Sequence, residues 1–221
     1  DVTTQLCGDV GRAVASLLPP KSRVCIATDT RTSGDSLKRA VVSGLLSGGT
    51  DATDLGILPT PALAWLTREL GFATGIMVTA SHNPPEFNGL KLFNGDSLGY
   101  SVHQEQQVEE ACSAKDRRAS RKPGTPSVDR SSKDRYLDYL AGRFKGRVAD
   151  RGLKVVVDPG NGAASGLASQ LLRRLGLKVV PVNDEPDGRF PGRSPEPKED
   201  TLSDTIALLK KEQADLAICF D

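Results

Sequence analysis

The sequence predicts an α/β protein built from layered three-layer α/β/α domains with mixed, largely parallel sheets. Short apolar runs alternate with segments of helical periodicity, and glycine or proline separates them. The same rhythm restarts after a Pro/Gly/Ser-rich stretch at residues 123–127. Alternating strands and helices are typical of parallel sheets covered on both faces. We therefore expect a first domain over residues 1–135 and most of a second, similar domain over 136–221.

The first half of the chain divides into elements by its apolar periodicity. Thr3 or Thr4 is expected to cap the first helix, Ser33 the second, and Pro61 is placed at the first turn of the third. The expected elements, in order, are a helix over 6–18, a strand over 24–27, a helix over 33–48, a strand over 51–57, a helix over 61–70, strands over 75–78 and 90–93, and a polar helix over 102–119.

The second half repeats this order after the stretch at 123–127, which we interpret as a linker. A helix over 131–144 is expected to lead into the second domain. The expected elements that follow are a strand over 153–157, a loop over 158–163, a helix ending at 175, a strand over 178–182, a Pro-rich loop over 186–197, a helix over 202–211 and a strand over 216–220.

Composition excludes several classes of partner. The formal net charge is +1, with 38% hydrophobic and 26% charged residues, so no global field would draw the protein to nucleic acid or an anionic membrane. The basic cluster at 115–122 has no interleaved aromatic side chains, which favours a solvated linker over a binding patch. Four separated cysteines without a C-x-x-C pair fit a reducing compartment, and we expect a cytoplasmic protein.

Ser81 is the first candidate for chemistry, because it follows the apolar run Ile76-Met77-Val78-Thr79-Ala80. Ligand sites of open α/β sheets lie at the carboxyl ends of strands. Pro84-Pro85 stiffens the loop after Ser81, and a tight Asn88-Gly89 turn returns Lys91 towards the same end. The loop thus gathers the Ser81 hydroxyl, the His82 imidazole and the Lys91 ammonium, a set suited to phosphate chemistry.

Other interpretations of Ser81 stay open at this point. A serine before a histidine at a strand end is most often a capped turn. A Ser-His-Asp hydrolase is a second alternative, but Ser81 lacks the G-x-S-x-G elbow and His82 is its direct neighbour in the chain.

Two further positions in the second half are candidates for binding. The loop Asp158-Pro159-Gly160-Asn161-Gly162-Ala163 joins a strand to a helix, where amide groups can hold an anion. Close strand-to-helix packing is the favoured reason for its glycines. Asp221 ends the last expected strand, and its carboxylate is a suitable oxygen ligand for Mg²⁺.

The motifs, in their order along the chain, resemble those of the α-D-phosphohexomutases, which include phosphomannomutase/phosphoglucomutase and phosphoglucosamine mutase. The segment Thr79-Ala80-Ser81-His82-Asn83-Pro84 is similar to the active-serine signature of that family, and Asn88-Gly89-Leu90-Lys91 to the N-G-x-K that follows it. The supporting segments are Asp29-Thr30-Arg31-Thr32-Ser33-Gly34, Asp54-Leu55-Gly56 with Pro59-Thr60-Pro61, Asp158 to Gly162, and Pro186-Asp187-Gly188-Arg189-Phe190-Pro191.

The resemblance implies an isomerase of the intramolecular phosphotransferase type. A phosphoserine at Ser81 would pass its phosphoryl group to a hexose 1-phosphate, and the resulting 1,6-bisphosphate would return the other phosphoryl group to Ser81. It also implies Mg²⁺ at Ser81 and Asp221, the latter matching the first Asp of a D-G-D-x-D-R loop, with His82 and Lys91 near the phosphate or sugar. The implied partners are hexose phosphate and hexose 1,6-bisphosphate. Neither the preferred sugar nor the oligomeric state follows from these residues.

Two departures from the family pattern qualify this expectation. The opening segment F-G-T-x-G-x-R-G is absent before Asp1, which is not an initiator Met, and the chain stops at the first metal-loop Asp. We therefore expect the first domain and most of the second, and a chain that is inactive or nearly so alone. A non-catalytic sugar-phosphate-binding module of the same fold, and a phosphatase using Ser81, are the alternative functions.

Overall fold

The chain folds into two compact units of α/β type, which confirms the predicted fold class. The computed structural model describes residues 2–114, 122–144, 146–147 and 152–221. The first unit comprises Asp1–Thr28, Ser33–Thr79 and Asn88–Ser132, and the second comprises Asp29–Thr32, Ala80–Phe87 and Lys133–Asp221. The predicted boundary between residues 135 and 136 stays a prediction.

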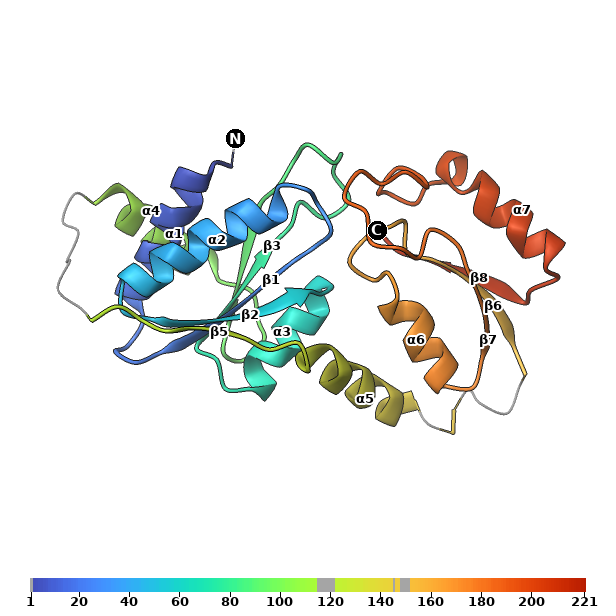
Figure 1. Ribbon diagram of the computed structural model, residues 1–221, viewed down its shortest axis with the longest axis horizontal. Coiled ribbons are helices and arrows are strands. Elements are labelled where there is room, and N and C mark those ends of the chain that lie inside the picture. Colours follow the sequence, from blue (N-terminus) through green and yellow to red (C-terminus); the bar gives the residue numbers. More distant parts are fainter. Residues whose placement is uncertain (1, 115–121, 145, 148–151) are drawn as a thin grey trace. The chain divides into compact units, whose positions relative to one another are not determined.

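The first unit contains a five-stranded sheet in the order β4-β3-β1-β2-β5 (Figure 1). Strands β1, β2, β3 and β5 run parallel to one another, and β4 pairs antiparallel with β3, so the sheet is mixed and largely parallel as predicted. The strands are β1 (Arg23–Thr28), β2 (Asp51–Ile57), β3 (Thr74–Val78), β4 (Leu90–Asn94) and β5 (Pro126–Val128).

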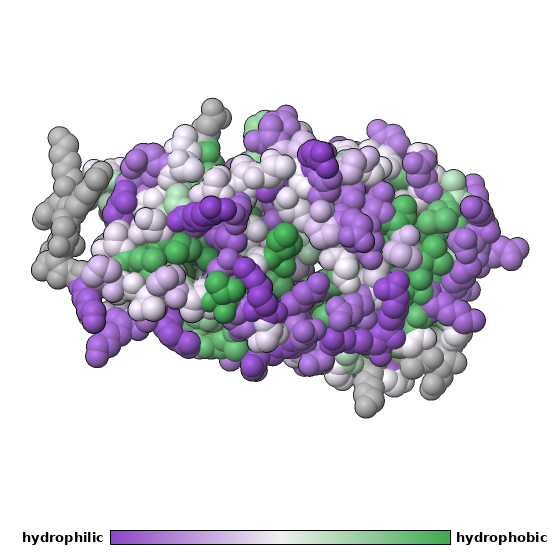
Figure 2. Space-filling view, viewed as in Figure 1, coloured by the Kyte–Doolittle hydropathy of each residue, from purple (hydrophilic) through white to green (hydrophobic). Residues whose placement is uncertain are grey.

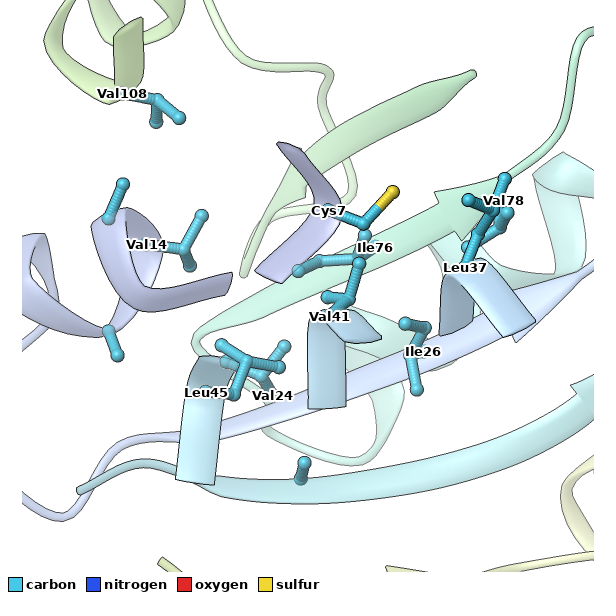
Figure 3. Packing of buried hydrophobic residues seen from close by; sticks show 13 residues of the cluster. Cys7, Val14, Val24, Ile26, Leu37, Val41, Leu45, Ile76, Val78 and Val108 are labelled. Carbon is cyan, nitrogen blue, oxygen red and sulfur yellow. The ribbon is translucent and has the colours of Figure 1, made fainter. Parts of the chain in front are cut away.

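Helices lie on both faces of this sheet, because the side chains of its central strand alternate between two apolar layers. Val24 and Ile26 of β1 pack in the core beneath α1 and α2 (Figure 3), whereas Cys25 contacts Thr67 of α3 on the other face. The helices of this unit are α1 (Thr4–Leu17), α2 (Gly34–Ser47), α3 (Thr60–Glu69) and α4 (Val102–Ser113).

The second unit has a three-stranded parallel sheet in the order β7-β6-β8. Val155 and Val157 of β6 pack with Ala164 and Ala168 on the α6 side, while α7 contacts β6 and β8. The elements are α5 (Ser132–Phe144), β6 (Lys154–Asp158), α6 (Leu167–Arg174), β7 (Lys178–Pro181), a 3₁₀ turn (Glu199–Thr201), α7 (Ser203–Lys211) and β8 (Leu216–Cys219).

Two predictions about local structure are wrong. Ser33 occupies the N-cap position of α2, but its side chain makes no capping bond; its hydroxyl accepts a hydrogen bond from the Asn88 amide at 2.9 Å instead. The stretch at 123–127 is not simply a linker, because β5 begins at Pro126 and pairs with β2. Proline is tolerated at the first position of such an edge strand.

The polar helix predicted over 102–119 ends earlier than expected. α4 stops at Ser113, and Ala114 is extended at its C-cap. Residues 115–121, which include most of the predicted basic cluster, lie outside the described residues.

No helix among the described residues is long and apolar enough to cross a membrane. Figure 2 shows polar side chains over most of the visible face, with smaller apolar areas between them. The apolar side chains of the first unit that are best buried lie instead between its sheet and helices (Figure 3).

Candidate functional site

Ser81 lies in a strained turn directly after a central strand. β3 ends at Val78, and the amide of Thr79 donates to the carbonyl of Gly89 at 3.0 Å, which closes the base of the loop. Ser81 itself has φ of 56°, in the left-handed region that residues other than glycine seldom adopt. Such strain persists only where surrounding contacts hold it, and it is enriched at functional sites.

Arg31 supplies those contacts to the loop at residues 80–87, here called the serine loop. Its Nη2 donates to the carbonyls of Ser81 and Asn83, both at 2.7 Å. Its Nη1 donates to the carbonyls of Pro84 at 2.5 Å and Phe87 at 3.0 Å. The Arg31 side chain is fully buried, so these bonds are sheltered from water.

Asp29 orients the Arg31 guanidinium. The Nε of Arg31 donates to Oδ2 of Asp29 at 3.0 Å, and the backbone amide of Arg31 donates to Oδ1 at 3.0 Å. Asp29 directly follows β1, so the carboxyl end of that strand carries the residue that fixes the arginine. A buried guanidinium requires such a partner, because an unpaired buried charge is costly.

The structure brings His82 and Asp221 near each other in the second unit. Nδ1 of His82 lies 3.7 Å from Oδ2 of Asp221, close enough for an ion pair when the imidazole is protonated but longer than a hydrogen bond. Both side chains are exposed, that of His82 to 50% and that of Asp221 to 59%. A ligand can therefore reach both groups from solvent.

Lys91 belongs to the first unit and lies on β4 opposite Met77 of β3. Its neighbours Leu90 and Leu92 pack against the core beneath α1 and α2, so the exposed Lys91 side chain extends from the other face of the sheet.

Asp221 follows the strand β8, whose end is held by a second buried arginine. Nη2 of Arg193 donates to the carbonyl of Phe220 at 2.6 Å and to that of Asp158 at 3.2 Å. Its Nε donates to Oδ2 of Asp158 at 2.9 Å, and the two side chains are 3% and 0% exposed. The residue that precedes Asp221 is thereby fixed to the end of β6.

Asp158 stays ionised although it is buried. Burial raises the pKa of its carboxyl group, but hydrogen bonds from Thr205, Arg193, the Gly160 amide and Asn183 outweigh burial and leave the pKa below its ordinary value. The charge therefore acts as a structural anchor inside the second unit.

The loop at 158–163 uses its amide groups within the protein. The amide of Gly160 donates to Asp158, that of Asn161 to the carbonyl of Asn183, and that of Gly162 to the carbonyl of Pro159. Gly160 has φ of 56°, and a Cβ there would lie 2.8 Å from the Arg193 guanidinium. These contacts support close packing as the reason for the glycines. The three amides already have hydrogen-bond acceptors within the protein, so they are not available to hold an anion.

Few candidate metal ligands lie close together in the described part of the chain. No group of three or more His, Cys, Asp or Glu side chains there is placed to hold a metal ion. The predicted pair of oxygen donors, the Ser81 hydroxyl and the Asp221 carboxylate, is of the kind that Mg²⁺ prefers.

Comparison with known protein families identifies the family to which this chain belongs. Residues 1–119 match the family described as phosphoglucomutase/phosphomannomutase, alpha/beta/alpha domain I, and residues 134–221 match its alpha/beta/alpha domain II. The chain belongs to this family. The resemblance inferred from the serine loop and its flanking motifs is thus confirmed.

Relatives with different names share this similarity. A phosphoglucosamine mutase of Alkaliphilus oremlandii is 40% identical over 100% of the chain and 50% of its own length. A phosphopentomutase of Thermococcus kodakarensis is 42% identical over 100% of the chain and 48% of its own length. The chain therefore spans about half the length of the curated relatives it matches.

A solved structure supports the same fold. The crystal structure of a phosphoglucomutase/phosphomannomutase family protein from Burkholderia thailandensis superposes with a TM-score of 0.85 at 31% identity. The match covers 100% of the chain and 49% of that protein.

The roles of Arg31 and Arg193 were missed by the sequence reasoning. Arg31 entered only as part of the Asp29 to Gly34 motif, and Arg193 was not singled out. A signal was present for Arg31, since the charged residues Asp29 and Arg31 directly follow β1, whose last five residues are buried. A charged pair placed there must be either exposed or satisfied by neighbouring backbone.

Proposed function

We propose that the intact protein carrying this chain is a phosphohexomutase, which interconverts hexose 1-phosphate and hexose 6-phosphate through phosphoserine at Ser81. The observation that carries the proposal is Ser81 itself, held in a left-handed conformation after β3 within the family's serine motif. A capped turn would not require that strain, because any residue of ordinary φ can end a strand.

In the proposed reaction, the bond between phosphorus and Oγ of Ser81 breaks as a new bond forms to a free hydroxyl of the hexose monophosphate. The sugar hydroxyl loses its proton and Oγ of Ser81 takes one up, so the products are the free serine hydroxyl and hexose 1,6-bisphosphate. The bisphosphate then returns its other phosphoryl group to Ser81. Such transfers depend mainly on positioning and on neutralising negative charge.

We assign His82 and Lys91 to the phosphate or the sugar. Both side chains are exposed, so a ligand can reach them, and a cation beside a transferring phosphoryl group stabilises the developing charge. The imidazole of His82 can also act as a proton donor or acceptor in the transfer.

We further assign Ser81 and Asp221 as protein ligands of Mg²⁺. Both supply hard oxygen donors, and Asp221 is 59% exposed, which leaves room for water or phosphate ligands. When bound, the ion would supply positive charge against the phosphate. Arg193 keeps the backbone before Asp221 in place.

The proposal concerns a reaction class acting on sugar phosphates in the cytoplasm. The relatives' names include glucosamine and pentose phosphates as well as the hexose names of the family, so a panel of sugar phosphates is the appropriate set of substrates.

The proposal is tested by peptide-level mass spectrometry of the intact protein after incubation with a hexose 1,6-bisphosphate and Mg²⁺. We expect phosphate on Ser81 and on no other serine, and none in a Ser81→Ala variant. In a coupled assay, Ser81→Ala should lower the mutase rate by a factor of at least about 10³, because the phosphoryl carrier is lost.

Two outcomes would favour the alternatives. Tight binding of a hexose phosphate with no phosphate on Ser81 would indicate a binding module. Release of inorganic phosphate at the rate at which Ser81 loses its label would indicate a phosphatase.

A further inference from the structure

The guanidinium of Arg31 is fully committed, and four of its five acceptors belong to one loop. Arginine carries five N–H donors. In the structure, one bonds the Asp29 carboxylate and the others bond the carbonyls of residues 81, 83, 84 and 87. The loop residues 82–87 are exposed, so this buried guanidinium is a major attachment of an otherwise solvated loop.

We propose that Arg31 is the positioning residue of the serine loop, fixing its backbone so that Ser81 presents its hydroxyl in one orientation. The inference rests on the proposed phosphoryl transfer at Ser81 for its functional meaning. Its structural content, that one guanidinium sets the order of the loop, does not depend on that function.

The loop at residues 186–191 covers Arg31 from another side. The Arg31 guanidinium carbon lies 5.4 Å from the centre of the Phe190 ring, within the range of a cation–π contact. Phe190 has φ of 51° although it precedes Pro191, a combination that costs energy for an aromatic residue. Because the fold keeps Phe190 in this costly conformation, we infer that the position of its ring over Arg31 is important.

Gly188 brings this covering loop into close contact with the backbone beside Arg31. A Cβ on Gly188 would lie 2.2 Å from the carbonyl oxygen of Thr30 and 2.6 Å from Cα of Arg31. Only glycine fits at that distance from another backbone. The motif at 186–191 is thus explained as the cover of the arginine that holds the serine loop.

Lysine cannot replace arginine in this role. An ammonium group carries three donors from a single nitrogen, whereas the guanidinium reaches five acceptors in a planar fork. An Arg31→Lys variant keeps the charge beside Asp29 but must release at least two of the present bonds. The expected result is a loosened serine loop within a folded protein.

The test combines hydrogen exchange with kinetics in the intact protein, comparing Arg31→Lys and Phe190→Leu with wild type. Within the serine loop, the amides of Asn83 and Phe87 are hydrogen-bonded to the carbonyls of Ala80 and Pro84. We expect their exchange to accelerate at least tenfold in Arg31→Lys and two- to fivefold in Phe190→Leu, while amides of β1 and β3 change less than twofold. Arg39→Lys, at an exposed arginine paired with Asp35, is the matched control and should leave all of them unchanged.

The kinetic arm separates positioning from binding. Arg31→Lys should lower kcat by about 10²-fold and change KM less than threefold, because a small misplacement of the reacting group affects the transfer step most. Unchanged exchange at Asn83 and Phe87 would overturn the proposal, as would acceleration spread equally over β1 and β3. If wild-type Ser81 accepts no phosphate, the proposed function fails, and hydrogen exchange still decides whether Arg31 anchors the loop.

Discussion

Arg31 and Arg193, two buried arginines among the described residues of the second unit, use the same chemistry for different purposes. Each pairs through Nε with an aspartate at the carboxyl end of a strand, Asp29 after β1 and Asp158 in β6. Each donates its four remaining N–H groups to backbone carbonyls. The acceptors of Arg31 lie in the serine loop, whereas those of Arg193 belong to residues 158, 194, 195 and 220.

The distribution of acceptors indicates what each arginine stabilises. Arg193 joins three separate parts of the second unit, so its loss should affect the folding of that unit. Arg31 binds one exposed loop, whose carbonyls can turn to water when the arginine is lost. The same number of hydrogen bonds thus supports global stability in one place and local order in the other.

The largest effect is expected for Arg193→Met. The change leaves the Asp158 carboxylate buried without its cation, and removing one partner of a buried pair typically costs about 3–5 kcal/mol. Denaturant unfolding followed by a probe in the second unit should show a loss of that size. Arg31→Met should lose less, because the Asp29 side chain that loses its cation is 10% exposed, whereas the Asp158 side chain is fully buried. Equal losses would remove the distinction between the two arginines.

A smaller effect is expected for Asp158→Asn, with a distinctive pH dependence. The amide keeps the shape of the side chain but weakens its bonds to Arg193, Gly160 and Thr205, and we expect a loss of about 1–3 kcal/mol at neutral pH. Because the folded-state pKa of Asp158 lies below its ordinary value of 3.8, the carboxylate stabilises the fold above that value. This contribution is lost as the pH falls through the lowered pKa.

The decrease of the unfolding free energy at acidic pH measures how strongly the ionisation of Asp158 is coupled to folding. Wild type should lose stability below about pH 4 more steeply than Asp158→Asn, in unfolding curves recorded at a series of pH values. Parallel curves would contradict an ionised Asp158 in the folded protein.

Gly188→Ala should weaken the cover of Arg31. The added methyl group meets the backbone of residues 30–32, which cannot move aside as a flexible side chain can, and overpacking of this kind costs about 1–3 kcal/mol. Exchange at the Asn83 and Phe87 amides should accelerate with the change. If Gly188→Ala folds and its Asn83 and Phe87 amides exchange as in wild type, the loop at 186–191 does not help to hold the serine loop in place.

The smallest effect is expected for Gly142→Ala, which makes the same substitution as Gly188→Ala but at an exposed glycine within a helix. Gly142 is an exposed residue of α5, and a Cβ there meets nothing within 4 Å. Alanine should stabilise the protein by up to about 1 kcal/mol through helix propensity, seen as a raised unfolding midpoint. A loss of stability would contradict the open surroundings of Gly142.

Strand and helix positions followed from the sequence where apolar periodicity was strong. The fully buried β3 and the amphipathic α1 were predicted within two residues of their observed bounds. β5 was missed because a three-residue edge strand that begins with proline has the composition of a linker. Ser33 was assigned as a cap from its type and position, and its hydroxyl went to Asn88, a residue distant in the sequence.

The candidate site was only partly predictable for the same reason. Ser81, His82 and Lys91 share one short segment whose motif indicates their chemistry. Arg31 and Phe190 reach that segment through tertiary contacts, and local spacing carries no information about which carbonyls a buried guanidinium will find.

The most direct test of the central claim, that the serine loop carries the phosphoryl group, is a chase experiment. The intact protein is labelled with phosphate at Ser81 and mixed with unlabelled hexose monophosphate and Mg²⁺, and samples are quenched over time. We expect label to leave Ser81 as fast as it appears in hexose bisphosphate and then in monophosphate. Label that stays on Ser81, or leaves it only as inorganic phosphate, would show that Ser81 does not pass its phosphoryl group to the sugar.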